Sequence, residues 1–327
     1  FSGIGCASRK GILIKGSGYM EQLAKLGVCV FDKTGTLTKG QFSLTEVHAQ
    51  DGDNDALLSM AAALEENSNH PIARSIVSAC PPERRSAVSE FTEQPGLGVS
   101  GILDGAHICA GNRALMEHLG IVLSEEESAG TVIHVARENE YLGYLVIEDC
   151  EKDEAKQALA ALHTQGVQKL VMLTGDREGA AKAVASRLGI DEYHASLLPG
   201  DKVGYVEGYL GKTGSVAFVG DGINDAPVLS RADVGIAMGA MGSDAALEAA
   251  DVVLMQDKLT ALPLAVRISR KTKRIVMENI VAALAVKAVV LVLGALGVAS
   301  MWIAIFADVG VLILAVLNAM RALTIKD

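Results

Sequence analysis

The sequence predicts an α/β protein built on a parallel sheet, with an α+β domain inserted into it and a transmembrane helical hairpin after it. Three observations carry this prediction. Short apolar runs alternate with helical patterns, one long segment interrupts this alternation, and two apolar stretches lie near the C-terminus. The 327 residues suffice for two or three domains at about 150 residues per domain.

The alternating part of the chain predicts the parallel sheet. Apolar runs at 28–31, 170–173 and 216–219 each end in a turn that carries a carboxylate, and helical patterns at 151–164 and 179–188 lie between them. Such alternation is typical of a parallel sheet, in which ligands bind at the carboxyl ends of the strands. We therefore expect the three turns to meet at one edge of the sheet.

A second domain interrupts this alternation. Helical patterns at 56–66 and 72–79 are followed by glycine-punctuated strand patterns at 91–110 and 131–142. This mixture predicts an inserted α+β domain, after which the first sheet resumes near residue 144. The expected division of the chain is the cytoplasmic end of a preceding membrane helix at 1–15, the first domain at 16–40 and 144–262, the insert at 41–143, and a basic linker with two membrane helices at 263–327.

The C-terminal region predicts a membrane hairpin. Residues 280–299 and 301–320 form two stretches of about 20 apolar residues, which matches the thickness of a bilayer core. Basic residues precede the first stretch and follow the second, so the positive-inside rule places both ends in the cytoplasm. The alternative is a buried helical hairpin inside a soluble domain. Lys287 and Asp308 lie within the stretches, and charged residues at this depth are functional candidates because they are costly to bury in lipid.

Composition excludes several classes of protein. The formal net charge of −10 argues against a nucleic-acid partner, because phosphate backbones are held by clustered Lys and Arg. Half of the residues are hydrophobic and the mean hydropathy is +0.31, which is high for a purely soluble protein. The five cysteines form no Cys-x-x-Cys pair, so we expect reduced structural thiols.

The segment 31–38 carries the clearest chemistry. It places Asp32 at the end of a buried strand, followed by Lys, Gly and three Thr. A carboxylate in this position can attack phosphorus and form an aspartyl-phosphate. Asp221 and Asp225 offer the oxygen ligands that Mg²⁺ takes, and Lys202 can reach a phosphoryl oxygen. A lone Asp-Lys-Thr would indicate only a surface turn, but here the other residues follow it in order.

Three motifs together resemble the phosphorylation domain of P-type ATPases, which has the haloacid-dehalogenase-like fold. They are DKTGTLT at 32–38, TGD at 174–176 and GDGINDAP at 220–227, and the resemblance extends over nearly the whole chain. It implies that Asp32 is phosphorylated by ATP and that Asp221 and Asp32 hold Mg²⁺. The further catalytic residues that it implies are Lys33, Thr34, Thr174, Gly175, Asp176, Lys202, Asn224 and Asp225.

One residue predicts how long the phosphorylated state lasts. Related phosphatases place a second acid two residues after the nucleophile, where it protonates the leaving group and activates water. In this sequence that position is Thr34. A threonine cannot perform this acid–base role, so we expect a long-lived aspartyl-phosphate.

The inserted domain resembles the nucleotide-binding domain of heavy-metal-transporting P-type ATPases. The segment Ser-Asn-His-Pro-Ile-Ala at 68–73 is similar to their His-Pro motif, although a His-Pro pair alone would be an ordinary helix start. The glycines would allow the backbone to approach the nucleotide closely. The residues that this resemblance assigns to ATP are Glu65, His70, Gly96, Gly98, Gly111 and Asn112.

The residues of the predicted hairpin favour one group of transported metals. The Asn, Tyr, Met and Ser motifs of copper pumps are absent from 280–320, whereas Lys287 followed by Asp-x-Gly at 308–310 resembles the zinc, cadmium and lead branch. The resemblance implies ATP-driven export of such a metal, with Asp308 as a ligand of the transported ion and Lys287 as its counter-ion. A copper pump is the alternative, followed by a membrane-tethered phosphatase of the same superfamily and a non-catalytic nucleotide-sensing subunit.

The expected surroundings follow from the same resemblance. The chain begins at Phe1 and contains no Thr-Gly-Glu loop and no Cys-Pro-Cys motif. We therefore expect the C-terminal portion of a pump that transports only together with its actuator domain and remaining membrane helices. Its expected partners are the transported divalent metal ion and the lipid bilayer, in the cell (inner or plasma) membrane with the soluble domains in the cytoplasm.

Overall fold

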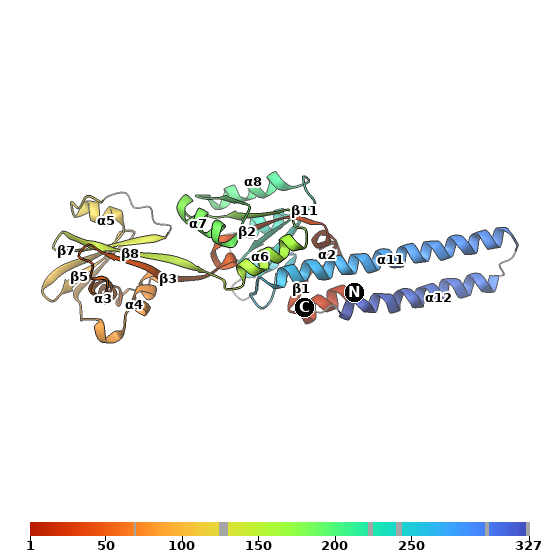
Figure 1. Ribbon diagram of the computed structural model, residues 1–327, viewed down its shortest axis with the longest axis horizontal. Coiled ribbons are helices and arrows are strands. Elements are labelled where there is room, and N and C mark those ends of the chain that lie inside the picture. Colours follow the sequence, from red (N-terminus) through yellow and green to blue (C-terminus); the bar gives the residue numbers. More distant parts are fainter. Residues whose placement is uncertain (69, 124–129, 222–224, 240–243, 298–300, 325–327) are drawn as a thin grey trace. The chain divides into compact units, whose positions relative to one another are not determined.

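The computed structural model describes residues 1–68, 70–123, 130–221, 225–239, 244–297 and 301–324. The chain divides into two compact units (Figure 1). The first unit comprises Phe1–Leu37, Asp153–Gly175 and Ala185–Asp327. The second unit comprises Thr38–Lys152 and Asp176–Val184.

A seven-stranded sheet forms the centre of the first unit. Its order is β1-β13-β12-β11-β2-β9-β10, and every pair of neighbours is parallel except β1 and β13. The three apolar runs of the sequence are the adjacent strands β11, β2 and β9, so the predicted parallel sheet is confirmed. The strands are β1 (Ile12–Ile14), β2 (Leu26–Asp32), β9 (Lys169–Leu173), β10 (Glu192–His194), β11 (Ser215–Gly220), β12 (Val234–Met238) and β13 (Val252–Leu254).

Burial on both faces explains the continuous apolar runs. All seven residues of β2 and all six of β11 are buried, as expected for parallel strands covered by helices on both sides. The helices of this unit are α1 (Ser2–Arg9), α2 (Ser17–Ala24), α6 (Ala155–Thr164), α8 (Pro199–Tyr209), α9 (Ala226–Arg231), α10 (Asp244–Ala249), α11 (Ala261–Ala295) and α12 (Met301–Met320), with short helical turns η1 (Lys33–Leu37) and η4 (Arg321–Thr324). Helix α7 (Glu178–Leu188) is shared between the two units.

Three aspartates fix the sheet at the opposite edge from the catalytic motifs. Asp191, Asp233 and Asp251 each precede a strand, and each carboxylate accepts a hydrogen bond from a backbone N–H at the start of the neighbouring strand. The donors are Leu170, Val216 and Gly235, at 2.7–2.9 Å. These bonds stabilise the first backbone amides of the strands and help to hold the register of the ladder.

The second unit is built on a six-stranded antiparallel sheet of order β3-β8-β7-β6-β5-β4. Helices α3 (Asn54–Glu65) and α4 (Pro71–Ala79) contribute to the apolar core on one face. A smaller cluster forms around α5 (Arg113–His118). The strands are β3 (Thr38–Ala49), β4 (Ser89–Gln94), β5 (Gly98–Leu103), β6 (Ala106–Gly111), β7 (Thr131–Arg137) and β8 (Glu140–Glu151), with one short turn η2 (Pro82–Arg84).

The boundary expected at residue 144 is wrong. Tyr144 lies within β8 and pairs with His48 of β3, so it belongs to the second sheet and not to the first. The two strands continue as a paired ribbon as far as Thr38 and Glu151. Because β3 and β8 pair along a continuous ribbon, the pattern of apolar side chains does not change at residues 41 or 143. Domain limits drawn from that pattern therefore fall inside the strands.

The apolar stretches form a helical hairpin, as predicted (Figure 1). The second stretch coincides with α12, but the first is the end of the 35-residue helix α11, which stops at Ala295 rather than at 299. Gly297, at φ +71°, has the left-handed conformation that commonly ends a helix. The Asn279 Nδ2 donates to the Ala315 carbonyl at 3.0 Å, and the Asn318 Nδ2 donates to Asn279 Oδ1 at 2.8 Å.

The N-terminal segment differs from the expectation for 1–15. Its first part is helical, in α1, but Ile12–Ile14 form strand β1 and pair antiparallel with β13 in the sheet. The burial pattern of β1 explains this placement, because Ile12 and Ile14 are buried and Leu13 is exposed. Alternation with period two is the strand pattern for one covered face.

Candidate functional site

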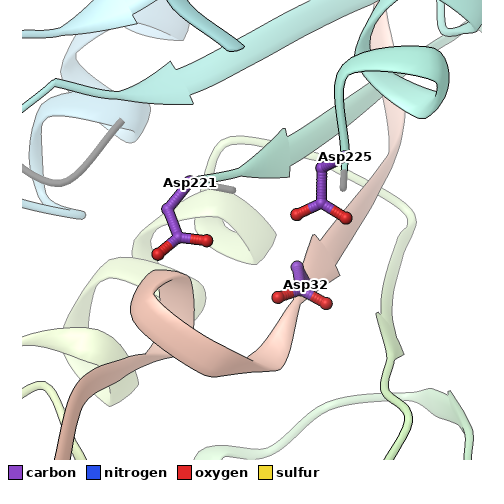
Figure 2. Close-up of side chains that lie close together, drawn as sticks. All are labelled: Asp32, Asp221 and Asp225. Atoms are coloured by element: carbon purple, nitrogen blue, oxygen red, sulfur yellow. The ribbon is translucent and has the colours of Figure 1, made fainter. Parts of the chain in front are cut away.

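Three carboxylates converge at the carboxyl edge of the first sheet. Asp32 is the last residue of β2, Asp221 follows β11, and Asp225 directly precedes α9 (Figure 2). The three residues offer ligand atoms that all lie within 4.8 Å of one another. Asp32 faces Leu173 in the register of β2 and β9, so the ends of these neighbouring strands are level. The predicted convergence of the strand ends is therefore present in the structure.

Lys202 joins two of these carboxylates. Its Nζ lies 2.6 Å from Asp32 Oδ1 and 2.9 Å from Asp225 Oδ1. Lys202 is in the first turns of α8, and all three side chains are buried. Burial alone lowers the pKa of Lys202, but the neighbouring charges of Asp32 and Asp225 outweigh it and raise that pKa. The ammonium group is therefore held in its charged form.

Asp32, the candidate nucleophile, lies close to several charged side chains. Burial first and the negative charge of Asp225 second raise the pKa of Asp32, to about 7, against the opposing effect of Lys202. Asp221 adds a smaller repulsion. Such a cluster favours an additional cation, and Mg²⁺ takes carboxylate oxygens as ligands. The charge and the donor atoms of Asp32, Asp221 and Asp225 therefore fit a magnesium ion.

A glycine allows Asp221 to reach this position. Gly35 has φ +72°, and a Cβ atom built on it would overlap the Asp221 carboxylate. The backbone after Asp32 turns at this point, in η1, so that the loop passes directly against Asp221. Only glycine permits both the left-handed conformation and the close approach.

The other predicted residues of the phosphorylation motifs have different environments. Lys33 is buried, whereas Thr34 is exposed beside Asp32. Thr174 is 2% exposed, and its backbone N–H donates to the His194 carbonyl at 3.0 Å.

The remaining residues of the phosphorylation motifs are Gly175, Asp176 and Asn224. Gly175 approaches the Leu197 carbonyl closely enough that a Cβ would lie 3.3 Å from it. Asp176 groups with the second unit, and Asn224 lies outside the described residues.

One residue of the loop was not singled out from the sequence. Thr36 is fully buried, and its hydroxyl has no hydrogen-bond partner within the described part of the chain. A buried hydroxyl without a partner, in the turn that follows Asp32, is available to a ligand. The sequence signal was its place in the threonine-rich turn after Asp32, but side-chain burial within a loop is not visible in a periodic pattern.

The predicted nucleotide residues all lie in the second unit. Glu65 ends α3, and His70 precedes α4, where its Nδ1 accepts a hydrogen bond from Ile72 N at 3.3 Å. Asn112 precedes α5, and its Oδ1 accepts from Leu115 N at 3.1 Å. His70 and Asn112 therefore cap helices in addition to any role in binding.

The glycines of this unit also have structural contacts. Gly98 of β5 pairs with Gly111 of β6, and a Cβ on either would overlap the backbone of the facing strand. A Cβ on Gly96 would meet no atom within 4 Å. Asn112 Nδ2 donates to the Gly96 carbonyl at 2.7 Å and fixes this turn. Gly98 and Gly111 thus permit strand contact, while Gly96 is the one of the three with open space beside it.

The charged residues of the hairpin lie beside the contact between its helices. Lys287 and Asp308 are exposed, and no ion pair joins them in the described part of the hairpin. Lys287 lies four residues after the half-buried Ala283, and Asp308 lies three residues before the half-buried Val311, so each charge shares a helix face with a half-buried residue.

Comparison with known families and proteins identifies relatives of this arrangement. The model of the family described as haloacid dehalogenase-like hydrolase matches residues 26–233. The chain is 48% identical over 332 residues to a cadmium, zinc and cobalt-transporting ATPase of Bacillus subtilis (strain 168), which covers 100% of this chain and 47% of that protein. It is 48% identical over 325 residues to a zinc-transporting ATPase of Synechocystis sp. (strain ATCC 27184 / PCC 6803 / Kazusa), with 98% and 45% covered. The chain therefore spans about half the length of the curated relatives that it matches.

Solved structures are also similar to this chain. A zinc-transporting PIB-type ATPase in its E2.Pi state matches with a TM-score of 0.88 and 37% identity, covering 98% of this chain and 54% of that chain. The catalytic domain of the CPx-ATPase CopB-B matches with a TM-score of 0.64 and 31% identity, covering 79% of this chain and 96% of that chain.

Proposed function

Because this chain belongs to the haloacid dehalogenase-like hydrolases and, within them, to the heavy-metal-transporting P-type ATPases, we propose that it carries the catalytic part of an ATP-driven exporter of divalent metal ions. The observation that carries the proposal is the arrangement of Asp32, Lys202, Asp221 and Asp225 at one sheet edge. In this proposal the first unit is the phosphorylation domain, and the second unit is the nucleotide-binding domain.

Asp32 is the nucleophile of the proposed reaction. Its carboxylate oxygen forms a bond to the γ-phosphorus of ATP, and the bond from that phosphorus to the β,γ-bridging oxygen breaks, so that ADP leaves with the electron pair. Lys202 holds Asp32 and places positive charge next to the incoming phosphoryl oxygens. Lys33, Thr34, Thr174, Gly175, Asp176 and Asn224 are the other residues that we assign to the phosphoryl group.

Asp32, Asp221 and Asp225 are the residues that would hold Mg²⁺. When bound, this ion neutralises negative charge on the phosphoryl oxygens. The chain's own contribution is to bring the three carboxylates together, and Gly35 makes this possible by leaving room for Asp221.

The product of this step is a stable aspartyl-phosphate. Hydrolysis of the aspartyl-phosphate needs a side chain that activates water. The exposed residue two positions after Asp32, where such a side chain would lie, is Thr34. A threonine hydroxyl is a poor general base at neutral pH. The phosphorylated state therefore persists until another part of the complete pump promotes its hydrolysis. This property favours a pump over a membrane-tethered phosphatase.

We assign the nucleotide to the second unit. The residues that we place against ATP are Glu65, His70, Gly96, Gly98, Gly111 and Asn112. Gly98, Gly111 and Asn112 also shape the turn that Gly96 belongs to. His70 supports this role by fixing the start of α4, which orients the exposed imidazole.

The transported ion and the membrane complete the proposal. The names of the relatives include cadmium, zinc and cobalt, and we extend zinc and cadmium to this chain, with lead as a further candidate. Asp308 is the proposed ligand of the ion, and Lys287 is its counter-ion. The two helices long and apolar enough to cross a bilayer support an integral membrane protein, which we place in the cell membrane with its soluble units in the cytoplasm.

Replacing Asp308 with alanine tests the transport assignment. In the complete pump, Asp308→Ala should reduce zinc-stimulated phosphorylation by ATP at least about tenfold. A carboxylate inside the membrane is energetically costly, so its presence there indicates a functional partner, which in this proposal is the transported ion. Phosphorylation by inorganic phosphate should stay within about twofold, because that route uses Asp32 but no transported metal. Both reactions are measured across a panel of Zn²⁺, Cd²⁺, Pb²⁺, Co²⁺ and Cu⁺. Normal zinc stimulation in the variant would refute the assignment of Asp308.

A further inference from the structure

Five basic residues are concentrated in the part of α11 that precedes the apolar stretch. They are Arg267, Arg270, Lys271, Lys273 and Arg274, and no acidic residue lies between them. The chain as a whole has the opposite balance, with a formal net charge of −10. Positive charge is therefore concentrated beside the proposed membrane spans, in a protein that is acidic overall.

The burial of α11 shows where this helix leaves the first unit. Seven of its residues between Leu262 and Ile275 are buried, whereas none of its residues after Ile275 is. Exposed apolar side chains begin with Val276 and Met277. The helix thus changes from a buried element of the first unit to an exposed apolar surface within two residues. We take Val276 as the start of the hydrocarbon-facing part.

The five basic residues differ in what they contact. Arg270 faces the first unit, where its Nε and Nη2 donate to the carbonyls of Ala24 and Leu26, both at 3.3 Å. Lys273 is half-buried. The other three basic residues are exposed, and they are Arg267, Lys271 and Arg274.

The three exposed residues share one face of α11, because they are spaced four and three residues apart. At a rise of 1.5 Å per residue, Arg274 lies about 3 Å before Val276, Lys271 about 8 Å and Arg267 about 14 Å. The headgroup layer of one leaflet is about 5–7 Å thick, and basic side chains have long stems that carry the charge toward it. Arg274 and Lys271 are therefore level with the headgroups, whereas Arg267 lies one turn farther away.

Lys271 and Arg274 also have donors to offer. Among the described residues, none forms a hydrogen bond or an ion pair with the Lys271 side chain. Arg274 uses only its Nε, which lies 3.2 Å from Glu278 Oε1, and its side chain is 82% exposed. Glu278 Oε2 lies 3.2 Å from Arg321 Nη1, so the same carboxylate brings a cation from the end of α12 beside Arg274. One carboxylate shared by two guanidinium groups leaves this cluster positively charged.

We propose that Lys271 and Arg274, with Arg321 beside them, bind the headgroup of an anionic phospholipid in the leaflet next to the first unit. This inference rests on the proposed placement of the hairpin in a bilayer. The planar guanidinium group of Arg274 can donate to two phosphate oxygens, and Lys271 adds a second charge one turn away. The acyl chains hold a lipid phosphate at this depth beside the exposed apolar surface, so a lipid is the occupant and not a soluble anion.

The experiment titrates the complete pump in detergent with phosphatidylglycerol or with phosphatidylcholine of the same acyl chains, and measures bound lipid by native mass spectrometry. Lys271→Gln and Arg274→Gln should each weaken the binding of one phosphatidylglycerol about fivefold, the usual contribution of one basic residue near an anionic surface. Phosphatidylcholine binding should stay within about twofold. Lys271→Arg keeps the charge and should keep the tight binding. Unchanged phosphatidylglycerol binding in either Gln variant would overturn the inference, and it is also the result expected if another helix of the pump covers this face.

Arg267→Gln is the matched control. It removes an exposed positive charge from the same face of the same helix, one turn farther from the apolar surface, and its lipid binding should equal that of the unchanged pump. An equal loss in Arg267→Gln would contradict the assignment, because the effect would then follow net charge and not position. Added glycerol phosphate should not displace phosphatidylglycerol, and displacement would assign the cluster to a soluble anion and overturn the inference.

Phosphorylation separates this inference from the proposed function. All the variants should still be phosphorylated by ATP within about twofold of the unchanged pump, because these residues are not part of the carboxylate cluster around Asp32. An unchanged pump that prefers phosphatidylglycerol through Lys271 and Arg274 but is never phosphorylated by ATP would overturn the proposed reaction and support the lipid site.

Discussion

Lys202→Ala should lower the rate of phosphorylation by ATP about 10²–10³-fold, the range observed when one preorganised electrostatic group is removed from an active site. The reason is the position of its Nζ, 2.6 Å from Asp32 and 2.9 Å from Asp225. Without the ammonium group, two buried carboxylates face each other uncompensated, and the pKa of Asp32 rises further. A larger fraction of Asp32 is then protonated and cannot attack phosphorus.

The control for this prediction is a lysine of the same region. Lys212 follows α8 and is exposed. Lys212→Ala should leave the phosphorylation rate within about twofold, as expected for an exposed charge without a buried partner. Lys202→Arg keeps the charge but not the compact shape, and it should recover only part of the lost rate. The rates are measured by rapid mixing with labelled ATP and acid quenching. A Lys202→Ala protein that phosphorylates at the unchanged rate would exclude Lys202 from the reaction.

Gly35→Ala should raise the Mg²⁺ concentration needed for half-maximal phosphorylation at least about tenfold, because second-shell changes around a metal typically cost 10–100-fold in affinity. A Cβ at this position would overlap the Asp221 carboxylate. The side chain of Asp221 then has to move away from Asp32 and Asp225. The measurement is the Mg²⁺ dependence of phosphorylation at saturating ATP.

A substitution at a second glycine separates the effect of backbone strain from the effect of the close contact with Asp221. Gly189 has the same φ of +72°, but a Cβ on it would meet no atom within 4 Å. Gly189→Ala should therefore show the modest loss of stability that a left-handed alanine causes, without a change in Mg²⁺ dependence. Equal shifts in Mg²⁺ dependence for the two variants would show that the close approach to Asp221 is not the cause.

Much of the fold could be predicted from the sequence because burial on both faces leaves a simple signature. The strands β2, β9 and β11 appear as continuous apolar runs, and the hairpin helices as two long apolar stretches. The limits of the inserted domain could not be predicted, because β3 and β8 are paired beyond them and carry mixed side chains. Strand β1 was missed because three residues are too few for a periodic signal.

The candidate site was predictable where residue type alone determines the chemistry. Asp32, Asp221, Asp225 and Lys202 were identified from their places after strands and within motifs, and the structure brings them together. The contacts of Gly98 with Gly111 were not predictable, because they depend on strand register.

Two further features could not be predicted from the sequence: side-chain contacts within the hairpin, and the effect of a charge on a residue distant from it along the chain. The absence of an ion pair between Lys287 and Asp308 in the described part of the hairpin depends on the placement of the side chains, which a pattern of apolar residues does not show. The raised pKa of Glu65 depends on its burial and on the charge of Glu93, which is distant from it along the chain.

The most direct test of the central claim is to locate the phosphoryl group after reaction with labelled Mg-ATP. The protein is quenched in acid and divided. One portion is treated with hydroxylamine and its remaining label is counted, and the other is digested at acid pH so that the labelled peptide can be identified by mass spectrometry. The account predicts an acid-stable, hydroxylamine-labile phosphate on Asp32 and no label in Asp32→Asn, because Asp32 lies at the carboxyl end of β2, where Lys202 holds it beside Asp225. Label retained in Asp32→Asn, or found on another residue of the unchanged protein, would contradict it.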